Sequence, residues 1–182
     1  MTRLLAVLTA AFALLLAGCG SSAPPPVPRS ADAVAPPRMI TIPSINAQSS
    51  LIRLGLNEDK TVQVPDVHTP EQAGWFVFSK KPGEIGPAVI LGHVDGDGKP
   101  GIFYHLDTLK PNARVIIERS DGTQLTYAVT QVTRTDKDEF PHDEVYGHTE
   151  ESELRLITCG GDWEGGQTGY ADNVIVSAKL IS

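Results

Sequence analysis

The sequence contains the stretch Leu154-Arg155-Leu156-Ile157-Thr158-Cys159-Gly160-Gly161, which has the pattern of a β-strand that ends in a cysteine. Successive side chains of a strand point to opposite faces, so Leu154 and Leu156 share one face and Arg155 and Cys159 share the other. The leucine face suits a hydrophobic core, and the opposite face then carries a guanidinium and a thiol. The two glycines at the strand end allow another segment to approach closely. We predict that Cys159 is a nucleophile.

Residues 1–19 have the pattern of a secretory signal, with Arg3 followed by the apolar run Leu4 to Leu16 and then by small residues. This run of 13 residues is short for a membrane-spanning helix, which needs roughly 20. Its end, Leu16-Ala17-Gly18-Cys19, resembles the bacterial lipobox. The resemblance implies cleavage before Cys19 and a diacylglycerol on its thiol, which would hold the protein on the membrane surface. The alternative is a plain signal peptide with an incidental cysteine, and the protein would then be secreted.

The cysteine count supports a reactive thiol. The chain has two cysteines, so acylation of Cys19 would leave Cys159 without a partner for an intramolecular disulfide. A single thiol outside the cytoplasm is either reactive or paired between molecules. Residues 20–37 are rich in proline and alanine and predict a semi-rigid tether. We therefore expect one globular domain over residues 38–182.

Composition and patterning predict an all-β domain. The 182 residues are 41% hydrophobic, which is enough for a core, and a net charge of -7 argues against a nucleic-acid partner. Many short strand-like runs at close spacing favour a sandwich or a closed barrel. Asp121-Gly122 predicts a hairpin turn, and Ile102 to Leu109 a short helix. The expected strands are Met39–Ile42, Leu51–Leu54, Thr61–Val64, Trp75–Phe78, Ala88–Leu91, Arg114–Glu118, Thr123–Val132, Leu154–Thr158 and Val174–Ile181.

A cysteine nucleophile needs a proton carrier, because its ordinary pKa leaves little thiolate at neutral pH. Of the five histidines, His93 directly follows the apolar run Val89 to Leu91 and precedes a loop rich in glycine and aspartate. A strand end would therefore hold it at the rim of the domain. His105 falls in the expected short helix and suits a structural role, and the other histidines lie in polar loops.

The segments Gly92-His93-Val94-Asp95 and Leu156-Ile157-Thr158-Cys159, in this order and with Cys159 64 residues after Asp95, resemble the sortase family. Leu-x-Thr-Cys at a strand end is the nucleophile signature of that family. Three further segments point to the class F sortases of actinobacteria, namely Phe140-Pro141, Val145-Tyr146-Gly147 and Tyr170-Ala171-Asp172-Asn173-Val174. The resemblance covers residues 38–182.

The resemblance implies a closed eight-stranded β-barrel with short helices and an extracytoplasmic cysteine transpeptidase. Cys159 would attack the Thr–Gly bond of an LPxTG-like sorting signal and form a thioester, and His93 would carry the proton. Thr158 would help to shape the substrate site. The acyl group would pass to a cell-wall amine, or to water as a side reaction. No cofactor or metal is expected, and we expect a lipid-anchored monomer.

The third catalytic residue departs from the family pattern. Many sortases have an arginine at the start of the strand after the cysteine loop, and this position holds Asn173 here. Asparagine donates a hydrogen bond but has no charge, so we assign Asn173 to substrate binding. We predict Arg155 as the substitute, because it shares a face with Cys159 at a Cα separation of about 13 Å. The alternatives are that Arg155 only balances Glu153, or that Arg134 on a neighbouring strand acts instead.

Other readings fit the sequence less well. A papain-like peptidase would have its cysteine before its histidine, and an L,D-transpeptidase would show Ser-His-Gly-Cys. A zinc site is disfavoured by one cysteine in the mature domain and scattered histidines. The competing interpretation is a non-catalytic, lipid-anchored barrel that binds sorting-signal peptides or cell-wall material.

Overall fold

The structure is a computed structural model that describes residues 33–166 and 169–182. The predicted signal segment, the lipidation site Cys19 and most of the predicted tether lie outside the described residues. The first strand begins at Pro37, the last residue assigned to the tether. Within the described ranges, no helix combines the length and the apolar character needed to cross a membrane.

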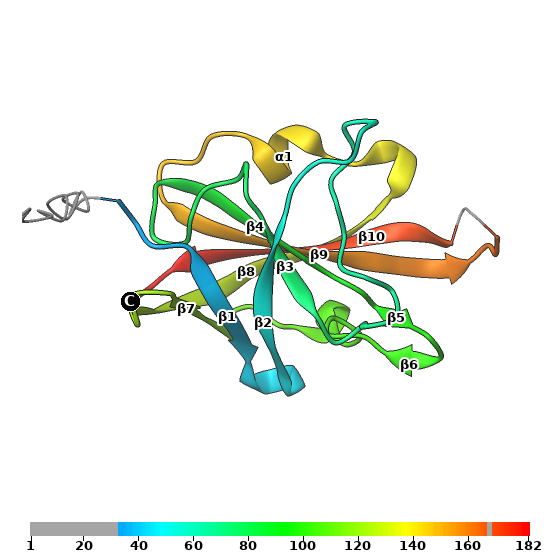
Figure 1. The fold of residues 1–182 in the computed structure, drawn as a ribbon, viewed down its shortest axis with the longest axis horizontal. Coiled ribbons are helices and arrows are strands. Elements are labelled where there is room, and N and C mark those ends of the chain that lie inside the picture. The colour runs from blue at the N-terminus through cyan, green and yellow to red at the C-terminus, as the bar shows by residue number, and fades with distance from the viewer. Residues whose placement is uncertain (1–32, 167–168) are drawn as a thin grey trace, which may run out of the picture. The chain divides into compact units, whose positions relative to one another are not determined.

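Eight strands form a closed barrel, which confirms the predicted all-β fold (Figure 1). Their order around the barrel is β1-β2-β3-β4-β9-β10-β8-β7, and β7 pairs with β1 to close it. The pairs β2–β3 and β4–β9 are parallel and the other pairs are antiparallel. The strands are β1 Pro37–Ile42, β2 Ala47–Leu54, β3 Ala73–Phe76, β4 Gly86–Gly92, β7 Arg114–Arg119, β8 Gln124–Asp136, β9 Ser152–Trp163 and β10 Tyr170–Leu180.

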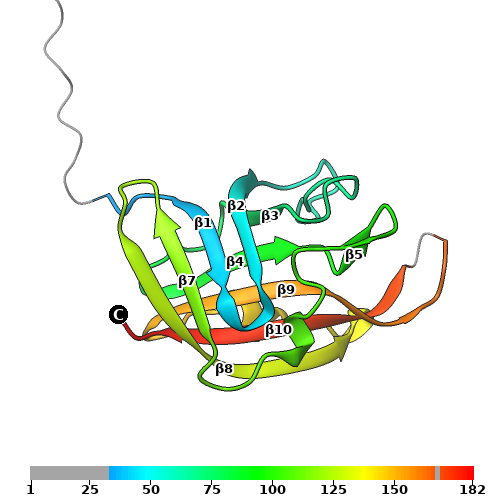
Figure 2. The ribbon, with the colours of Figure 1, turned by 90° about the horizontal axis from the view of Figure 1, so that it is seen from below.

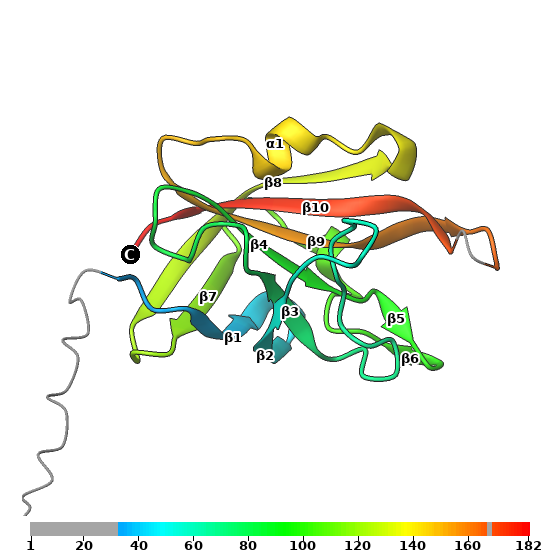
Figure 3. The same cartoon turned by 45° about the horizontal axis from the view of Figure 1, so that its top comes forward.

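The two faces of β9 pack into two different cores. Leu154 and Leu156 are fully buried inside the barrel. Ile157, on the other face, packs outside the barrel against Val145 of the short helix α1, His142–Tyr146. Figure 3 shows α1 lying over the outer side of the barrel. The face that carries Cys159 is therefore covered in its middle and becomes accessible only toward the strand end.

The remaining elements are short. They are the 3₁₀ turns η1 Pro43–Ile45, η2 Leu106–Thr108 and η3 Lys137–Glu139, and the two-residue strands β5 Asp95–Gly96 and β6 Lys99–Pro100. The β5–β6 hairpin and the far end of the β9–β10 hairpin lie at the same end of the barrel (Figures 1 and 2). This end also holds the segments that follow β4, and hence His93.

Several predicted elements are wrong in type or extent. The expected strand at Thr61–Val64 forms only an isolated bridge between Leu56 and Val62, because the chain folds back on itself in a turn in which Asn57 N donates to Thr61 O. The helix expected from Ile102 to Leu109 is reduced to η2. The predicted strand Trp75–Phe78 ends at Phe76. The polar stretch before β9, expected to be a loop, contains η3 and α1.

Candidate active site

Cys159 lies on β9, and His93 directly follows the neighbouring strand β4. The last pair in the parallel β4–β9 ladder joins Leu91 to Ile157. His93 and Cys159 each follow two residues later in their segments, so the two-residue repeat gives both side chains the same face as this pair. The parallel pairing thus brings the segment of the predicted proton carrier alongside the strand of the predicted nucleophile, and their catalytic roles stay predictions.

Asn173 and Thr135 extend this row across two more strands. Cys159 of β9 is paired with Asn173 of β10, and Asn173 is paired in turn with Thr135 of β8. Directly paired residues point to the same face of a sheet. The predicted substrate-binding residue Asn173 is therefore the immediate neighbour of the thiol on the side opposite His93.

A backbone carbonyl fixes the proton on one nitrogen of His93. Its Nε2 lies 2.6 Å from the carbonyl oxygen of Pro65, in the segment between β2 and β3. A carbonyl can only accept, so Nε2 carries a hydrogen in this contact. Nδ1 is then the atom left to exchange a proton with a reacting group. The backbone of His93 is held as well, because Phe103 N donates to its carbonyl oxygen at 3.0 Å.

The surroundings of the thiol act on its ionisation in opposite directions. Cys159 is half-buried and, within residues 33–166 and 169–182, forms no disulfide. Burial raises the pKa of Cys159, the positive charge of Lys137 acts to lower this pKa, and the negative charge of Asp95 acts to raise it further. The net direction is upward. A thiolate at this position therefore depends on nearby positive charge and on transfer of its proton to a base.

Asp95 and Tyr170 link the segment after His93 to the strand beside Cys159. The hydroxyl of Tyr170 donates a short hydrogen bond to the carboxylate of Asp95. This bond, ahead of burial and nearby negative charge, raises the pKa of Tyr170 to about 12. The contact joins β5 to the start of β10 and so holds the histidine segment against the cysteine hairpin.

Arg155 points away from the thiol, toward other partners. Its Nη1 donates to the Glu153 carboxylate at 2.7 Å, and its Nε donates to the carbonyl oxygen of Glu144 at 3.0 Å. Both charged side chains are largely buried, with exposed fractions of 8% for Arg155 and 12% for Glu153. The balancing contact with Glu153 considered from sequence is therefore present. The predicted catalytic role of Arg155 stays a prediction, and it requires the guanidinium to leave these contacts.

Two cavities flank the row that contains Cys159. A pocket of about 220 Å³ at the mouth of the barrel is lined by Thr158, Cys159 and Arg134, among others. Arg134 forms ion pairs there with Asp107 and Asp172. The Thr158 hydroxyl is buried and makes no hydrogen bond. Thr158 and Cys159 therefore line the same pocket, and the role of Thr158 in shaping the substrate site stays a prediction.

A larger groove of about 1110 Å³ lies on the outer side of the barrel. Its floor and walls include Asn173 and Lys137 at the thiol end and Phe76 and Tyr146 farther away. Phe140 and His142, between β8 and α1, form part of one wall. The groove reaches Asn173, the residue paired with Cys159.

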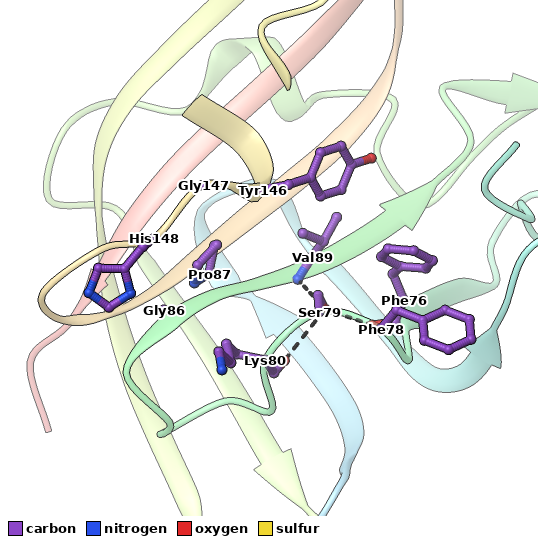
Figure 4. Close-up of a pocket in the computed structure, with 10 residues that line it drawn as sticks. All are labelled: Phe76, Phe78, Ser79, Lys80, Gly86, Pro87, Val89, Tyr146, Gly147 and His148. Atoms are coloured by element: carbon purple, nitrogen blue, oxygen red, sulfur yellow. Dashed lines mark hydrogen bonds between the residues drawn. The ribbon is translucent and has the colours of Figure 1, made fainter. Parts of the chain in front are cut away.

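A third cavity, of about 430 Å³, lies beside the first half of β4 and does not include His93 or Cys159. Figure 4 shows Phe76, Phe78 and Tyr146 around it, with Lys80 and His148 at its edge. The rings of Phe76 and Tyr146 stand edge to face with centroids 6.1 Å apart. These two residues also line the groove, so they separate the groove from this aromatic pocket.

Sequence reasoning missed the contributions of Lys137, Tyr170 and Asp95. Asp95 and Tyr170 fell inside the segments that carry the family resemblance, but nothing in the sequence joins them. Lys137 lies in a polar stretch without periodicity, and only the pairing of β8 with β10 brings it near Cys159. Among the described residues, no group of three or more side chains is placed to hold a metal ion.

The fold and this row of residues define a closed β-barrel protein with a cysteine on β9, a histidine directly after the neighbouring β4, and a groove that reaches Asn173 beside the cysteine. The sequence matches the family model described as Sortase domain over residues 40–181, and the chain therefore belongs to the sortase family. A search of curated protein sequences finds no match.

Solved structures with a similar fold are also sortases. Sortase C1 of Streptococcus agalactiae is 20% identical, with a TM-score of 0.62 over 80% of this chain and 66% of that one. Sortase A from Corynebacterium diphtheriae is 21% identical, with a TM-score of 0.61 over 83% and 63% of the two chains. Sortase C-1 from Actinomyces oris is 22% identical, with a TM-score of 0.61 over 79% and 73%. This chain thus spans slightly less than two thirds of the first two structures, and at these identities the likeness concerns the fold.

Proposed function

We propose that this protein is a class F sortase that cleaves LPxTG-like sorting signals and transfers the acyl part to a cell-wall amine. The observation that carries the proposal is the parallel pairing of β4 with β9, whose last pair, Leu91 with Ile157, precedes both His93 and Cys159 by two residues. Membership in the sortase family supports a cysteine transpeptidase, and the groove that reaches Asn173 supports an extended peptide as substrate.

The proposed reaction has two halves. The Cys159 sulfur attacks the carbonyl carbon of the threonine in the signal, and the Thr–Gly C–N bond breaks as His93 protonates the leaving amine. The product is a thioester on Cys159. An incoming amine then gives a proton to His93 and attacks the thioester carbon, which restores the thiol and forms a new amide. Water in place of the amine gives hydrolysis.

Side chains around the thiol would orient the substrate. Asn173, next to Cys159 on β10, can donate to a peptide carbonyl. Thr158, whose buried hydroxyl has no hydrogen-bond partner among the described residues, lines the pocket beside Cys159 and would help to shape the substrate site. The role predicted for Arg155 is to stabilise the oxyanion, after exchange of its contact with Glu153.

The cellular setting is part of the same proposal. Cleavage at Cys19 and acylation of its thiol would attach a monomer to the outer face of the cell membrane, with residues 20–37 as the tether. Exposure of the domain to the cell wall would then give it access to sorting signals and to amines. Globomycin, which blocks lipoprotein signal cleavage, should then cause the uncleaved precursor to accumulate in a bacterial host.

The direct test uses a quenched fluorescent LPxTG peptide with and without triglycine. We expect cleavage by the wild-type protein, a triglycine-ligated product, and loss of at least 100-fold in rate for Cys159→Ala and for His93→Ala. A folded wild-type protein that binds the peptide without cleaving it would instead support the non-catalytic barrel. Cleavage that persists in Cys159→Ala would contradict the proposed mechanism.

A further inference from the structure

We infer that Lys137 supplies the positive charge that stabilises the ionised thiol of Cys159. The residue of β10 that is paired with Cys159 is Asn173, which is uncharged. The catalytic consequence of this inference rests on the proposed function. The charge interaction itself can be measured without any peptide substrate.

The strand pairing places Lys137 at the correct edge of the site. The row Thr135, Asn173, Cys159 runs across β8, β10 and β9. Lys137 follows Thr135 by two residues, directly after the last residue of β8. Lys137 is the first residue of the 3₁₀ turn η3, so it lies just beyond the end of β8 where Thr135 pairs with Asn173.

Two independent contacts agree with this position. Lys137 and Asn173 line the same groove. A Cβ atom built on Gly169 would lie 3.9 Å from Lys137 Nζ, so the ammonium group reaches the start of β10 from the β8 side. Lys137 thus lies on the β8 side of Asn173, and its charge acts on Cys159 across β10.

Two arginines near the site, Arg155 and Arg134, form hydrogen bonds or ion pairs with other groups. Arg155 donates to Glu153 and to the Glu144 carbonyl, toward the start of β9. Arg134 is paired with Asp107 and Asp172 and lines the pocket at the barrel mouth.

The charged groups around the thiol define what Lys137 opposes. Asp95 of β5 acts to raise the pKa of Cys159, burial acts in the same direction and more strongly, and Lys137 acts against both. His93 is the adjacent base, and Tyr170 lies beside Asp95 as its hydrogen-bond donor. Asp138 and Glu139 follow Lys137 in η3 and are exposed. Without the Lys137 charge, burial and the negative charge of Asp95 would both still raise the pKa of Cys159.

The test is the pH dependence of Cys159 alkylation by iodoacetamide, measured on the full chain. We expect Lys137→Met to move the midpoint upward, because this variant removes a positive charge that acts to lower the pKa of Cys159. Lys137→Arg should restore the wild-type midpoint. Lys60→Met, which removes a charge from the same groove, should leave it unchanged.

Two outcomes would overturn the inference: an unshifted midpoint in Lys137→Met, or an equal shift in Lys60→Met. Arg155→Met provides the comparison with the sequence-based prediction, and a shift confined to that variant would also overturn the inference. Peptide cleavage is a separate readout, in which we expect kcat to fall more than KM changes. A thiol shift in a protein that never cleaves peptide would support the role of Lys137 and contradict only the proposed function.

Discussion

The ionisation of the Cys159 thiol depends on the groups around it. Burial alone raises its pKa, and the adjacent Asp95 raises it further. The thiol therefore does not ionise readily by itself, and the site has to supply both a base and a positive charge. Among residues near the thiol, His93 and Lys137 are placed to do so.

Removal of the Asp95 charge should favour the thiolate. Because this carboxylate raises the pKa of Cys159, Asp95→Asn should move the alkylation midpoint to lower pH. Tyr170→Phe removes the hydrogen bond but keeps the carboxylate, so it should not lower the midpoint. A midpoint that is lowered equally in both variants would show that the linkage of the two loops matters, rather than the charge.

Arg155 should contribute measurably to the stability of the barrel. Arg155→Met leaves the largely buried Glu153 carboxylate and the Glu144 carbonyl without this donor. We expect the free energy of unfolding in urea to fall by about 1 to 3 kcal/mol. Arg114→Met, an exposed position on β7, is the control. Equal stability of the two variants would contradict a structural role for Arg155.

The site residues differ in how far the sequence could predict them. Cys159 and His93 could be proposed because each ends an apolar run and together they match a family pattern. For Arg155, the contact with Glu153 was one of two alternatives from the sequence. The hydrogen bond to the carbonyl of Glu144 could not be predicted, because Glu144 lies in a different segment. Lys137 could not be found without the β8–β10 register.

Among the elements, β9 is the one that the sequence describes best. Its two-residue repeat places Leu154 and Leu156 inside the barrel, as predicted. The same repeat does not reveal that the opposite face is also covered, because Val145 and Phe140 come from a segment whose sequence is mostly polar. The strand-like composition of Thr61–Val64 was misleading, since no neighbouring strand pairs with it along its length.

The segment after β4 holds His93 through close backbone contact. A Cβ on Gly101 would lie 2.3 Å from the His93 carbonyl oxygen. Gly101→Ala should therefore displace His93 and reduce peptide cleavage at least tenfold while the barrel remains folded. The measurement is the cleavage rate together with circular dichroism.

Gly98→Ala is the matched control for this prediction. Gly98 lies in the same hairpin region, and a Cβ there meets nothing within 4 Å. Its positive φ of 71° makes alanine unfavourable by about 1 kcal/mol, but this strain does not involve His93. A loss of cleavage in Gly98→Ala as large as in Gly101→Ala would contradict the proposed contact.

At the scale of the whole molecule, the buried Tyr127 of β8 connects the start of β9 with the segment before β4, away from the candidate site. The Tyr127 hydroxyl lies 3.0 Å from Ser152 Oγ, and it accepts from Gly83 N at 2.9 Å. Ser152 begins β9 and Gly83 precedes β4, so this cluster lies at the end of these strands opposite to Cys159 and His93. The Tyr127 cluster and the proposed catalytic residues therefore lie at opposite ends of the same pair of strands.

Tyr127→Phe should separate these two properties. We expect the free energy of unfolding to fall by about 1 to 2 kcal/mol, because buried hydrogen-bonding groups lose their partner. The alkylation midpoint of Cys159 should not change. Tyr104→Phe, at an exposed position, should have little effect on stability. A shifted thiol midpoint in Tyr127→Phe would show that the two ends are coupled.

The same residue predicts a dependence of stability on alkaline pH. Burial raises the pKa of Tyr127 above its ordinary value of 10.0. The unfolded chain therefore ionises first as the pH rises, so this residue should reduce stability above pH 10. Urea unfolding as a function of pH should show a smaller alkaline loss in Tyr127→Phe, and identical curves would contradict the assignment.

Closure of the barrel is the part of the fold that patterning alone could not supply. Short strands and turn signals are equally consistent with a sandwich, and only the family resemblance favoured eight strands in a closed ring. The structure closes the ring through β1 and β7, where Ile40 pairs with Ile117. These residues are far apart in sequence, and their pairing has no local signal.

The central claim is that Cys159 forms a thioester with a sorting signal. Intact-protein mass spectrometry after mixing with an LPxTG peptide in the absence of added amine tests it directly. We expect an added mass equal to that of the peptide acyl part up to threonine, and we expect it on Cys159. Hydroxylamine should remove this adduct, and Cys159→Ala should not form it. Peptide cleavage without any such adduct under single-turnover conditions, or an adduct that forms equally in Cys159→Ala, would contradict it.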